Sequence, residues 1–177
     1  MSRTGNKEIN INGCDVEIKD NQILISSKSG SLSVPISKNI SIDKSENILK
    51  VKRIDDSKKS RELHGLTRTL IHNAIVGLTT GYTKKMFLQG IGYRVQMKGN
   101  NLEFSLGYSH PVNFEIADGV SAKVEGTDKF TLTSIDKQLI GQVCANIKSL
   151  RKKDSYKGKG IFFEGETIKK KPGKSVK

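Results

Sequence analysis

The segments 16–25, VEIKDNQILI, and 95–104, VQMKGNNLEF, predict the same local structure in the two halves of this 177-residue chain. In each segment, apolar residues alternate with polar ones on both sides of a polar turn, at 20–21 in the first and 99–100 in the second. Alternation with a period of two around such a turn is typical of a β-hairpin. The sequence therefore predicts two hairpins at an offset of 79 residues.

Each half continues with three short strand-like runs and then one segment in which apolar residues recur every three or four positions, the spacing of an amphipathic helix. The runs cover 32–36, 40–42 and 48–51 in the first half and 112–116, 122–124 and 130–133 in the second, and the helical segments cover 57–80 and 137–150. Residues 49–55 match residues 130–136 at an offset of 81, so two inserted loop residues reconcile this offset with that of the hairpins. The sequence predicts an α+β fold of two tandem similar domains, each an antiparallel sheet packed against one helix, produced by internal duplication.

The apolar positions of each predicted helix indicate which face is buried. In the first helix, Leu63, Leu66 and Leu70 lie about one turn apart and predict a stripe that faces the core. In the second helix, the stripe that contains Val143 and Ile147 predicts the core face. Cys144 lies beside this stripe and is expected to be a core residue.

Charge is distributed unevenly along the chain. The net charge is +13, and residues 148–177 contribute +8 of it through 11 basic and 3 acidic side chains, whereas residues 1–82 contribute +4 and residues 83–147 contribute +1. Basic termini on nearly neutral domains are typical of proteins that neutralise phosphates, so we expect a polyanionic partner. A disordered tail without a partner is the alternative for this composition alone. We divide the chain into an N-terminal domain at 1–82, a C-terminal domain at 83–168 and a basic tail at 169–177.

Several classes of protein do not fit this sequence. No apolar run approaches the about 18–20 residues needed to span a bilayer, so no membrane partner is expected. The first residues lack the pattern of a signal or transit peptide. Two cysteines 130 positions apart do not make a disulfide framework, which indicates a reducing compartment.

Catalytic and metal-binding motifs are not evident either. His64 and His72 lie eight residues apart on the first predicted helix without a Cys or carboxylate at metal-ligand spacing, so both are expected to be surface or capping residues. Cys14 has no basic partner close in sequence, and no pair of carboxylates stands out as acid and base. The GxG at 90–92 lacks the third glycine and the helix of a nucleotide-binding loop. We expect no catalytic residue, metal, cofactor or small-molecule substrate.

The strongest local indication of binding is the segment 156–160, YKGKG. Its lysines supply positive charge, its glycines let a phosphate approach the backbone, and its tyrosine offers a flat face for stacking on a base or ribose. A solvated turn is the alternative for such a motif alone. Together with the basic end of the second helix, the predicted patch consists of Arg151, Lys152, Lys153, Tyr156, Lys157, Gly158, Lys159 and Gly160.

Several motifs, in order and at matching distances, resemble those of the bacterial-type large-subunit ribosomal protein L6 family over almost the whole chain. They are Met1-Ser2-Arg3, Arg61-Glu62-Leu63-His64-Gly65 with Thr67-Arg68, Gly90-Ile91-Gly92-Tyr93-Arg94, Leu106-Gly107-Tyr108-Ser109-His110-Pro111-Val112, Asp136-Lys137-Gln138 with Gly141-Gln142, and Tyr156-Lys157-Gly158-Lys159-Gly160-Ile161 followed by Gly165-Glu166. The family is described as two similar α+β domains, which agrees with the duplication predicted above.

The resemblance implies a structural constituent of the large ribosomal subunit that supports translation. It implies binding to large-subunit (23S-type) rRNA, chiefly through the second domain, near the sarcin–ricin loop and the base of the stalk that receives translational GTPase factors. Neighbouring large-subunit ribosomal proteins are further expected partners, and the expected location is the ribosome of the cytoplasm or of an organelle. The implied RNA contacts lie in residues 153–160, at Ser109, His110 and Pro111, and in the tail at Lys169, Lys170, Lys171 and Lys174.

Two other functions remain as alternatives. A free-standing RNA-binding regulatory protein with the same patch predicts a stable complex with a small isolated RNA and little association with ribosomes. A basic enzyme that acts on nucleic acid requires a clustered acid/base or metal site, and no such cluster is evident in the sequence.

Overall fold

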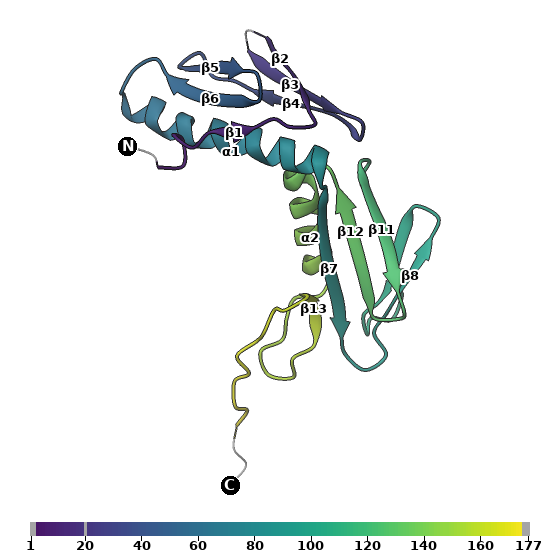
Figure 1. Cartoon of the computed structure of the whole chain (residues 1–177). Helices are drawn as coiled ribbons and strands as arrows, with labels where there is room; N and C mark the ends of the chain where they lie inside the picture. Colours follow the sequence, from purple (N-terminus) through teal and green to yellow (C-terminus); the bar gives the residue numbers. More distant parts are fainter. Residues whose placement is uncertain (1–2, 20, 175–177) are drawn as a thin grey trace. The chain divides into compact units, whose positions relative to one another are not determined.

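The computed structural model describes residues 3–19 and 21–174, which form two compact units (Figure 1). Unit 1 comprises Met1–Tyr82 with Ile135–Lys137, and unit 2 comprises Thr83–Ser134 with Gln138–Lys177. Met1, Ser2, Asp20 and the last three residues of the predicted tail, 175–177, lie outside the described residues.

Unit 1 contains two three-stranded antiparallel sheets and one long helix. Its strands are β1 (Ile9–Asn10), β2 (Asp15–Lys19), β3 (Gln22–Ser27), β4 (Gly30–Pro35), β5 (Ile40–Ser45) and β6 (Ile48–Arg53). The sheet orders are β1-β6-β5 and β2-β3-β4. Helix α1 (Lys58–Thr79) begins after Ser57, whose side chain accepts a hydrogen bond from the Ser60 N–H as an N-cap. The helix contacts strands of both sheets, so it closes the core of unit 1.

Unit 2 repeats this arrangement and adds one strand. Its strands are β7 (Tyr82–Gln89), β8 (Arg94–Lys98), β9 (Asn101–Ser105), β10 (Val112–Glu115), β11 (Val120–Glu125), β12 (Lys129–Ser134) and β13 (Gly160–Phe163). The sheet orders are β11-β12-β7-β13 and β10-β9-β8. Helix α2 (Lys137–Leu150) lies beside β7 and buries Ile140, Val143, Cys144 and Ile147, as the sequence predicts (Figure 1).

The predicted duplication is confirmed by the register of the strands. Val16 pairs with Ile25 in the first hairpin, and Val95 pairs with Phe104 in the second at the predicted offset. Burial repeats as well, because these four side chains are buried whereas the equivalent residues Ile18 and Met97 are 45% and 44% exposed. The order β5-β6-β1 in unit 1 corresponds to β11-β12-β7 in unit 2. Among the described strands, β13 therefore has no counterpart in unit 1.

The buried face of α1 differs from the prediction. Leu66, expected to face the core, is 53% exposed, and Leu63 and Leu70 are only partly buried. The helix instead buries a face that is polar in its N-terminal half and mainly apolar in its C-terminal half. The residues of that face are Ser60, His64, Thr67, Arg68, Ile71, Ala74, Ile75, Gly77 and Leu78. Its polar members can be buried because other parts of unit 1 provide hydrogen bonds, such as the 3.0 Å contact from Asn39 Nδ2 to Ser60 Oγ.

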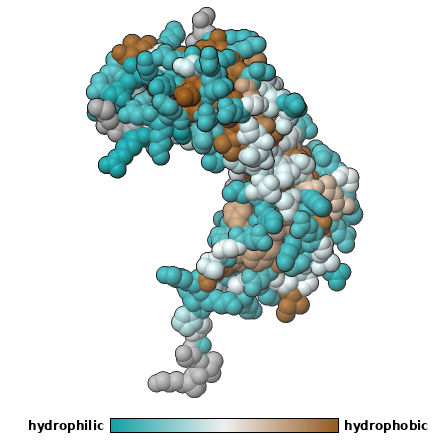
Figure 2. All heavy atoms as spheres, in the orientation of Figure 1, coloured by the Kyte–Doolittle hydropathy of each residue, from teal (hydrophilic) through white to brown (hydrophobic). Residues whose placement is uncertain are grey.

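The face of the chain that Figure 2 shows is mainly hydrophilic. On the face in view, polar side chains cover most of the surface and hydrophobic side chains form separate patches (Figure 2). Neither described helix is both long and apolar enough to cross a membrane.

Two alanine substitutions in α1 test which face is buried. Ile71 is fully buried, so we expect Ile71→Ala to reduce the free energy of unfolding by about 2–4 kcal/mol through lost burial and a cavity. The matched control Leu66→Ala should change it by less than about 0.5 kcal/mol. Urea unfolding of the full chain followed by circular dichroism measures both. A larger loss of unfolding free energy in Leu66→Ala than in Ile71→Ala would contradict the buried face seen in the structure and favour the face that the apolar spacing predicts.

Candidate nucleic-acid interface

Strand β13 fixes the position of the YKGKG segment in unit 2. It pairs antiparallel with β7, and Gly160 lies opposite Gln89. Residues 154–159, called the basic loop below, therefore enter the sheet beside the point where β7 ends (Figure 1). Backbone hydrogen bonds set this register, so the C-terminal end of the basic loop is attached at a fixed position on the edge of the sheet.

Asp154 holds the basic loop in a closed conformation. Its carboxylate accepts hydrogen bonds from the backbone N–H groups of Tyr156 (2.9 Å) and Lys157 (3.0 Å), which lower the pKa of Asp154 below its usual value. The Asp154 N–H donates to the Lys159 carbonyl (2.8 Å), and the Gly158 N–H donates to the Asp154 carbonyl (3.0 Å). The loop is thus an internally bonded turn rather than a freely solvated one.

The glycines of this segment have a structural role. Gly160 has a φ of 140°, and a Cβ on it would lie 2.9 Å from Lys153 Cα and 3.0 Å from the Lys152 carbonyl oxygen. Gly158 and Gly160 are both buried, and the Gly158 N–H already has a partner within the loop. The backbone of residues 152–153 lies so close to residue 160 that a larger side chain would not fit, which explains why this position is a glycine.

Arg151 joins two other loops to the end of α2. Its Nε donates a hydrogen bond to Tyr93 Oη at 3.2 Å, and its guanidinium carbon lies 4.8 Å from the centroid of the Tyr108 ring. Tyr108 Oη donates to the Leu150 carbonyl at 3.0 Å. These contacts hold the loop between β9 and β10 beside the residues that lead from α2 into the basic loop. The β9–β10 loop contains the exposed residues Ser109, His110 and Pro111. The structure therefore brings these predicted contacts together in unit 2.

Glu166 engages two of the C-terminal lysines. Its carboxylate pairs with Lys148 Nζ at 2.9 Å and with Lys153 Nζ, and it accepts the Phe163 N–H at 3.1 Å. Lys148 also lies over the Phe163 ring, 4.3 Å from its centroid. Partial burial alone would raise the pKa of Glu166, but the hydrogen bonds from Lys153, Lys148 and Phe163 lower it from 4.5 to about 2. Lys153, a predicted RNA contact, is therefore already paired within the protein.

The other predicted cations form no ion pair in the described part of the chain, although the charges of Lys157 and Lys159 help to lower the pKa of the nearby Asp154. Within residues 3–19 and 21–174, no ion pair involves Lys152, Lys157, Lys159 or the lysines of the tail at Lys169, Lys170, Lys171 and Lys174. Tyr156 is 61% exposed, so its ring is free to stack. The Lys171 N–H donates to the Ser155 carbonyl at 2.9 Å and so holds part of the tail against the basic loop. Unpaired charge on a fixed scaffold suits phosphate binding.

Two motif residues in unit 1 have internal roles instead. His64 was expected at the surface, but it is 2% exposed, and its Nε2 donates to the Val51 carbonyl at 2.9 Å. The surface prediction is wrong for His64 because β6 offers a carbonyl partner that spacing along the helix does not reveal. Arg68 is also buried and donates to the carbonyls of Lys7 (3.2 Å) and Glu8 (3.2 Å). His72 is exposed, as predicted.

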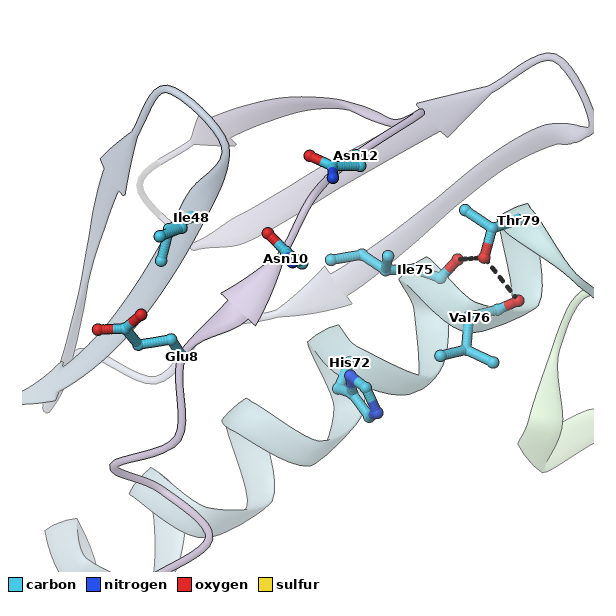
Figure 3. Close-up of a pocket in the computed structure, with 8 residues that line it drawn as sticks. All are labelled: Glu8, Asn10, Asn12, Ile48, His72, Ile75, Val76 and Thr79. Atoms are coloured by element: carbon cyan, nitrogen blue, oxygen red, sulfur yellow. Dashed lines mark hydrogen bonds between the residues drawn. The ribbon is translucent and has the colours of Figure 1, made fainter.

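A pocket of about 440 Å³ in unit 1 lies between β1 and α1 (Figure 3). Its lining residues are Glu8, Asn10, Asn12, Ile48, His72, Ile75, Val76 and Thr79. Partial burial, together with the charges of Arg68 and Lys137, lowers the pKa of His72, and Thr79 Oγ1 donates to the Ile75 carbonyl (2.9 Å). The Glu8 carboxylate is paired with Lys50 at 2.8 Å. The described residues contain no group of three or more His, Cys, Asp or Glu side chains that could hold a metal ion.

An array of unpaired cations beside an exposed aromatic ring is typical of nucleic-acid-binding proteins. A family model described as ribosomal protein L6 matches residues 12–81, which lie in unit 1, and residues 89–163, which lie in unit 2 apart from 135–137. The chain therefore belongs to the ribosomal protein L6 family. It is a structural rRNA-binding component of the large ribosomal subunit that acts in translation, and it is not an enzyme.

Sequence reasoning missed the residues that organise the surface. Tyr93, Tyr108 and Glu166 occur in the family motifs, but the sequence analysis gave them no role, and Asp154 was not singled out. The signal for Asp154 was present, because an Asp two and three residues before the N–H groups of a turn is a common local acceptor. No local pattern indicates that Tyr93 and Arg151 meet across 58 residues.

The Glu166 contacts predict a pH dependence of stability. Because the pKa of Glu166 is lower in the folded chain than its ordinary 4.5, its stabilisation is complete above about pH 4.5 and is lost as the pH falls towards 2. The loss should be on the order of 1 kcal/mol, since the ion pairs are partly hydrated. We expect Glu166→Gln to be less stable than wild type at pH 7 and to lose that difference by pH 2, as measured by urea unfolding across this pH range. A constant difference across the range would contradict the assignment.

Proposed function

We propose that unit 2 binds large-subunit rRNA of a bacterial-type ribosome near the sarcin–ricin loop and the base of the stalk that receives translational GTPases. The location follows from the family resemblance of the sequence motifs. The observation that carries the RNA-binding surface is the meeting of the 106–111 loop and the β7–β8 turn at Arg151, three residues before the basic loop begins. The domain boundaries of this proposal are 83–168 for the main binding part and 169–177 for the tail.

Binding would depend mainly on phosphate contacts by unpaired lysines. Each lysine that neutralises a phosphate releases condensed counterions, which favours association and makes it dependent on salt. Lys152, Lys157 and Lys159 can act in this way without breaking any ion pair of the described residues. At Lys153 a phosphate has to compete with the Glu166 carboxylate, so its net contribution to affinity is expected to be smaller.

Specificity would come from the shape of the RNA rather than from base reading in the major groove. A-form RNA has a deep and narrow major groove that side chains cannot read, and its backbone and minor groove remain accessible. A fixed surface built from two loops suits such recognition because the spacing between its charges is set by the fold. Tyr156 adds an exposed ring that can stack on a base or ribose.

Unit 1 is proposed to face solvent or neighbouring large-subunit proteins. Several of its cations are paired with acids, including Lys50 with Glu8 (2.8 Å) and Lys52 with Asp43 (2.6 Å). Paired surface charges contribute little net attraction for phosphates. Translational GTPases are proposed to act close by, as the stalk-base location implies.

The basic loop can be tested by removing two lysines. We expect Lys157→Ala/Lys159→Ala to weaken binding to an rRNA fragment that contains the sarcin–ricin stem about tenfold, and to reduce the slope of log affinity against log salt by about two at most. Filter binding at several salt concentrations measures both quantities.

The matched control removes the same charge from unit 1. Lys58→Ala/Lys59→Ala changes two exposed lysines of the first turn of α1, and its affinity and salt slope should stay near wild type. Equal losses in the two double variants would mean that net charge alone, and not the basic loop, governs binding.

The rRNA location can be tested by cleavage from a tethered iron chelate. Thr167 is exposed and follows Glu166, so a chelate on Thr167→Cys lies beside the basic loop without removing a lysine. In reconstituted large subunits, we expect hydroxyl radicals from this site to cleave the sarcin–ricin stem, as read by primer extension.

The control for this experiment uses the native cysteines. Cys14 is replaced by Ser in both proteins, and Cys144 stays because it is buried and burial raises the pKa of its thiol. The Cys14→Ser protein alone should therefore give no specific cleavage. Cuts confined to rRNA regions away from this stem would refute the proposed location. A protein that fails to enter subunits and instead binds a small isolated RNA would favour the regulatory alternative.

A further inference from the structure

The loop between β7 and β8 exposes an apolar side chain that the proposed surface does not yet use. Ile91 is 92% exposed, the largest exposure among the exposed large hydrophobic residues described in the chain. Single exposed apolar residues are common on protein surfaces, so the exposure of Ile91 alone does not indicate a function. Its surroundings distinguish it from the others.

The loop that carries Ile91 is firmly built. The Tyr93 N–H donates to the Gly90 carbonyl at 3.2 Å and closes a tight turn around Ile91. Tyr93 is itself buried, and its ring packs on the Gly90 backbone so closely that a Cβ at Gly90 would lie 2.8 Å from the ring. The turn therefore holds the Ile91 side chain outward at a fixed place.

This turn adjoins the basic loop. Gln89 lies opposite Gly160 in the β7–β13 pair, so residues 90–92 leave the sheet beside the residues that lead into Gly160. The same turn is joined to the end of α2 through the 3.2 Å hydrogen bond from Arg151 Nε to Tyr93 Oη. Two independent contacts of neighbouring residues, at Gln89 and Tyr93, thus connect the turn that carries Ile91 with the proposed RNA surface.

We propose that Ile91 is an additional RNA contact, an apolar wedge that packs on ribose or base edges in a minor groove while the neighbouring lysines bind phosphates. The minor groove of A-form RNA is wide and shallow and accepts a protruding side chain. Apolar side chains that enter a minor groove beside basic residues are a known way to contact a duplex. This inference rests on the proposed function of the basic loop.

Charge favours RNA over a protein as the occupant. Arg94, exposed and three residues after Ile91, has no ion-pair partner within the described part of the chain, and neither have Lys157 and Lys159. An exposed apolar side chain on the same proposed surface as unpaired cations complements a polyanion with apolar sugar faces. An apolar protein interface would leave those cations desolvated and unpaired, which costs free energy.

The test replaces Ile91 with a small polar residue. We expect Ile91→Ser to weaken binding to the rRNA fragment about tenfold with an unchanged salt slope, because it removes apolar contact and no phosphate contact. Ile91→Leu should retain wild-type affinity. The matched control is Met97→Ser, which removes another exposed apolar side chain of unit 2, at the far end of β8 from this turn, and should have no effect.

The outcomes separate this inference from the proposed function. If Lys157→Ala/Lys159→Ala weakens binding and Ile91→Ser does not, the wedge is wrong and the basic loop stands. If neither variant weakens binding, the basic loop itself is not at the RNA. If Ile91→Ser binds the RNA fragment normally but assembles poorly into large subunits, the occupant is a neighbouring protein and the RNA wedge is overturned.

Discussion

The Arg151 guanidinium joins three segments that the chain itself keeps far apart. It binds Tyr93 from the β7–β8 turn, lies over Tyr108 from the β9–β10 loop, and stands at the end of α2 just before the basic loop. Tyr108 also donates to the carbonyl of Leu150, the last residue of α2. Without these contacts the exposed residues of the two loops would have no fixed spacing from the lysines. A surface that recognises RNA by shape requires such spacing.

The duplicated fold could be predicted from the sequence because it depends on local alternation. The hairpins that start at Val16 and Val95 repeat both in pairing and in burial, and the period of two is visible in each. The buried face of α1 could not be predicted in the same way. Leu66 has the apolar spacing, but the helix buries His64 and Arg68, whose partners are carbonyls on distant segments. The periodicity of a helix indicates which face is apolar, but it contains no information about hydrogen-bond partners on distant segments.

The proposed binding surface shows the same division between local and distant information. Charge counting located the cations, since a run of lysines needs no tertiary context to be recognised. It did not locate the acids Asp154 and Glu166, because an acid next to a basic patch looks unfavourable for RNA binding. In the structure, Asp154 ties the backbone of the basic loop and Glu166 ties Lys148 and Lys153 to β13. These acids lower the net positive charge and in return hold the remaining cations in place.

Strand β13 also sets the order in which the surface can be assembled. It pairs with β7, although every other described strand of unit 2 lies between the two in sequence. Contacts between segments so distant along the chain close large loops and tend to form late in folding. During synthesis, β13 leaves the ribosome after the other strands of unit 2. The basic loop therefore takes its final shape only after the sheet beneath it exists, so the spacing between its lysines is among the last features of unit 2 to be fixed.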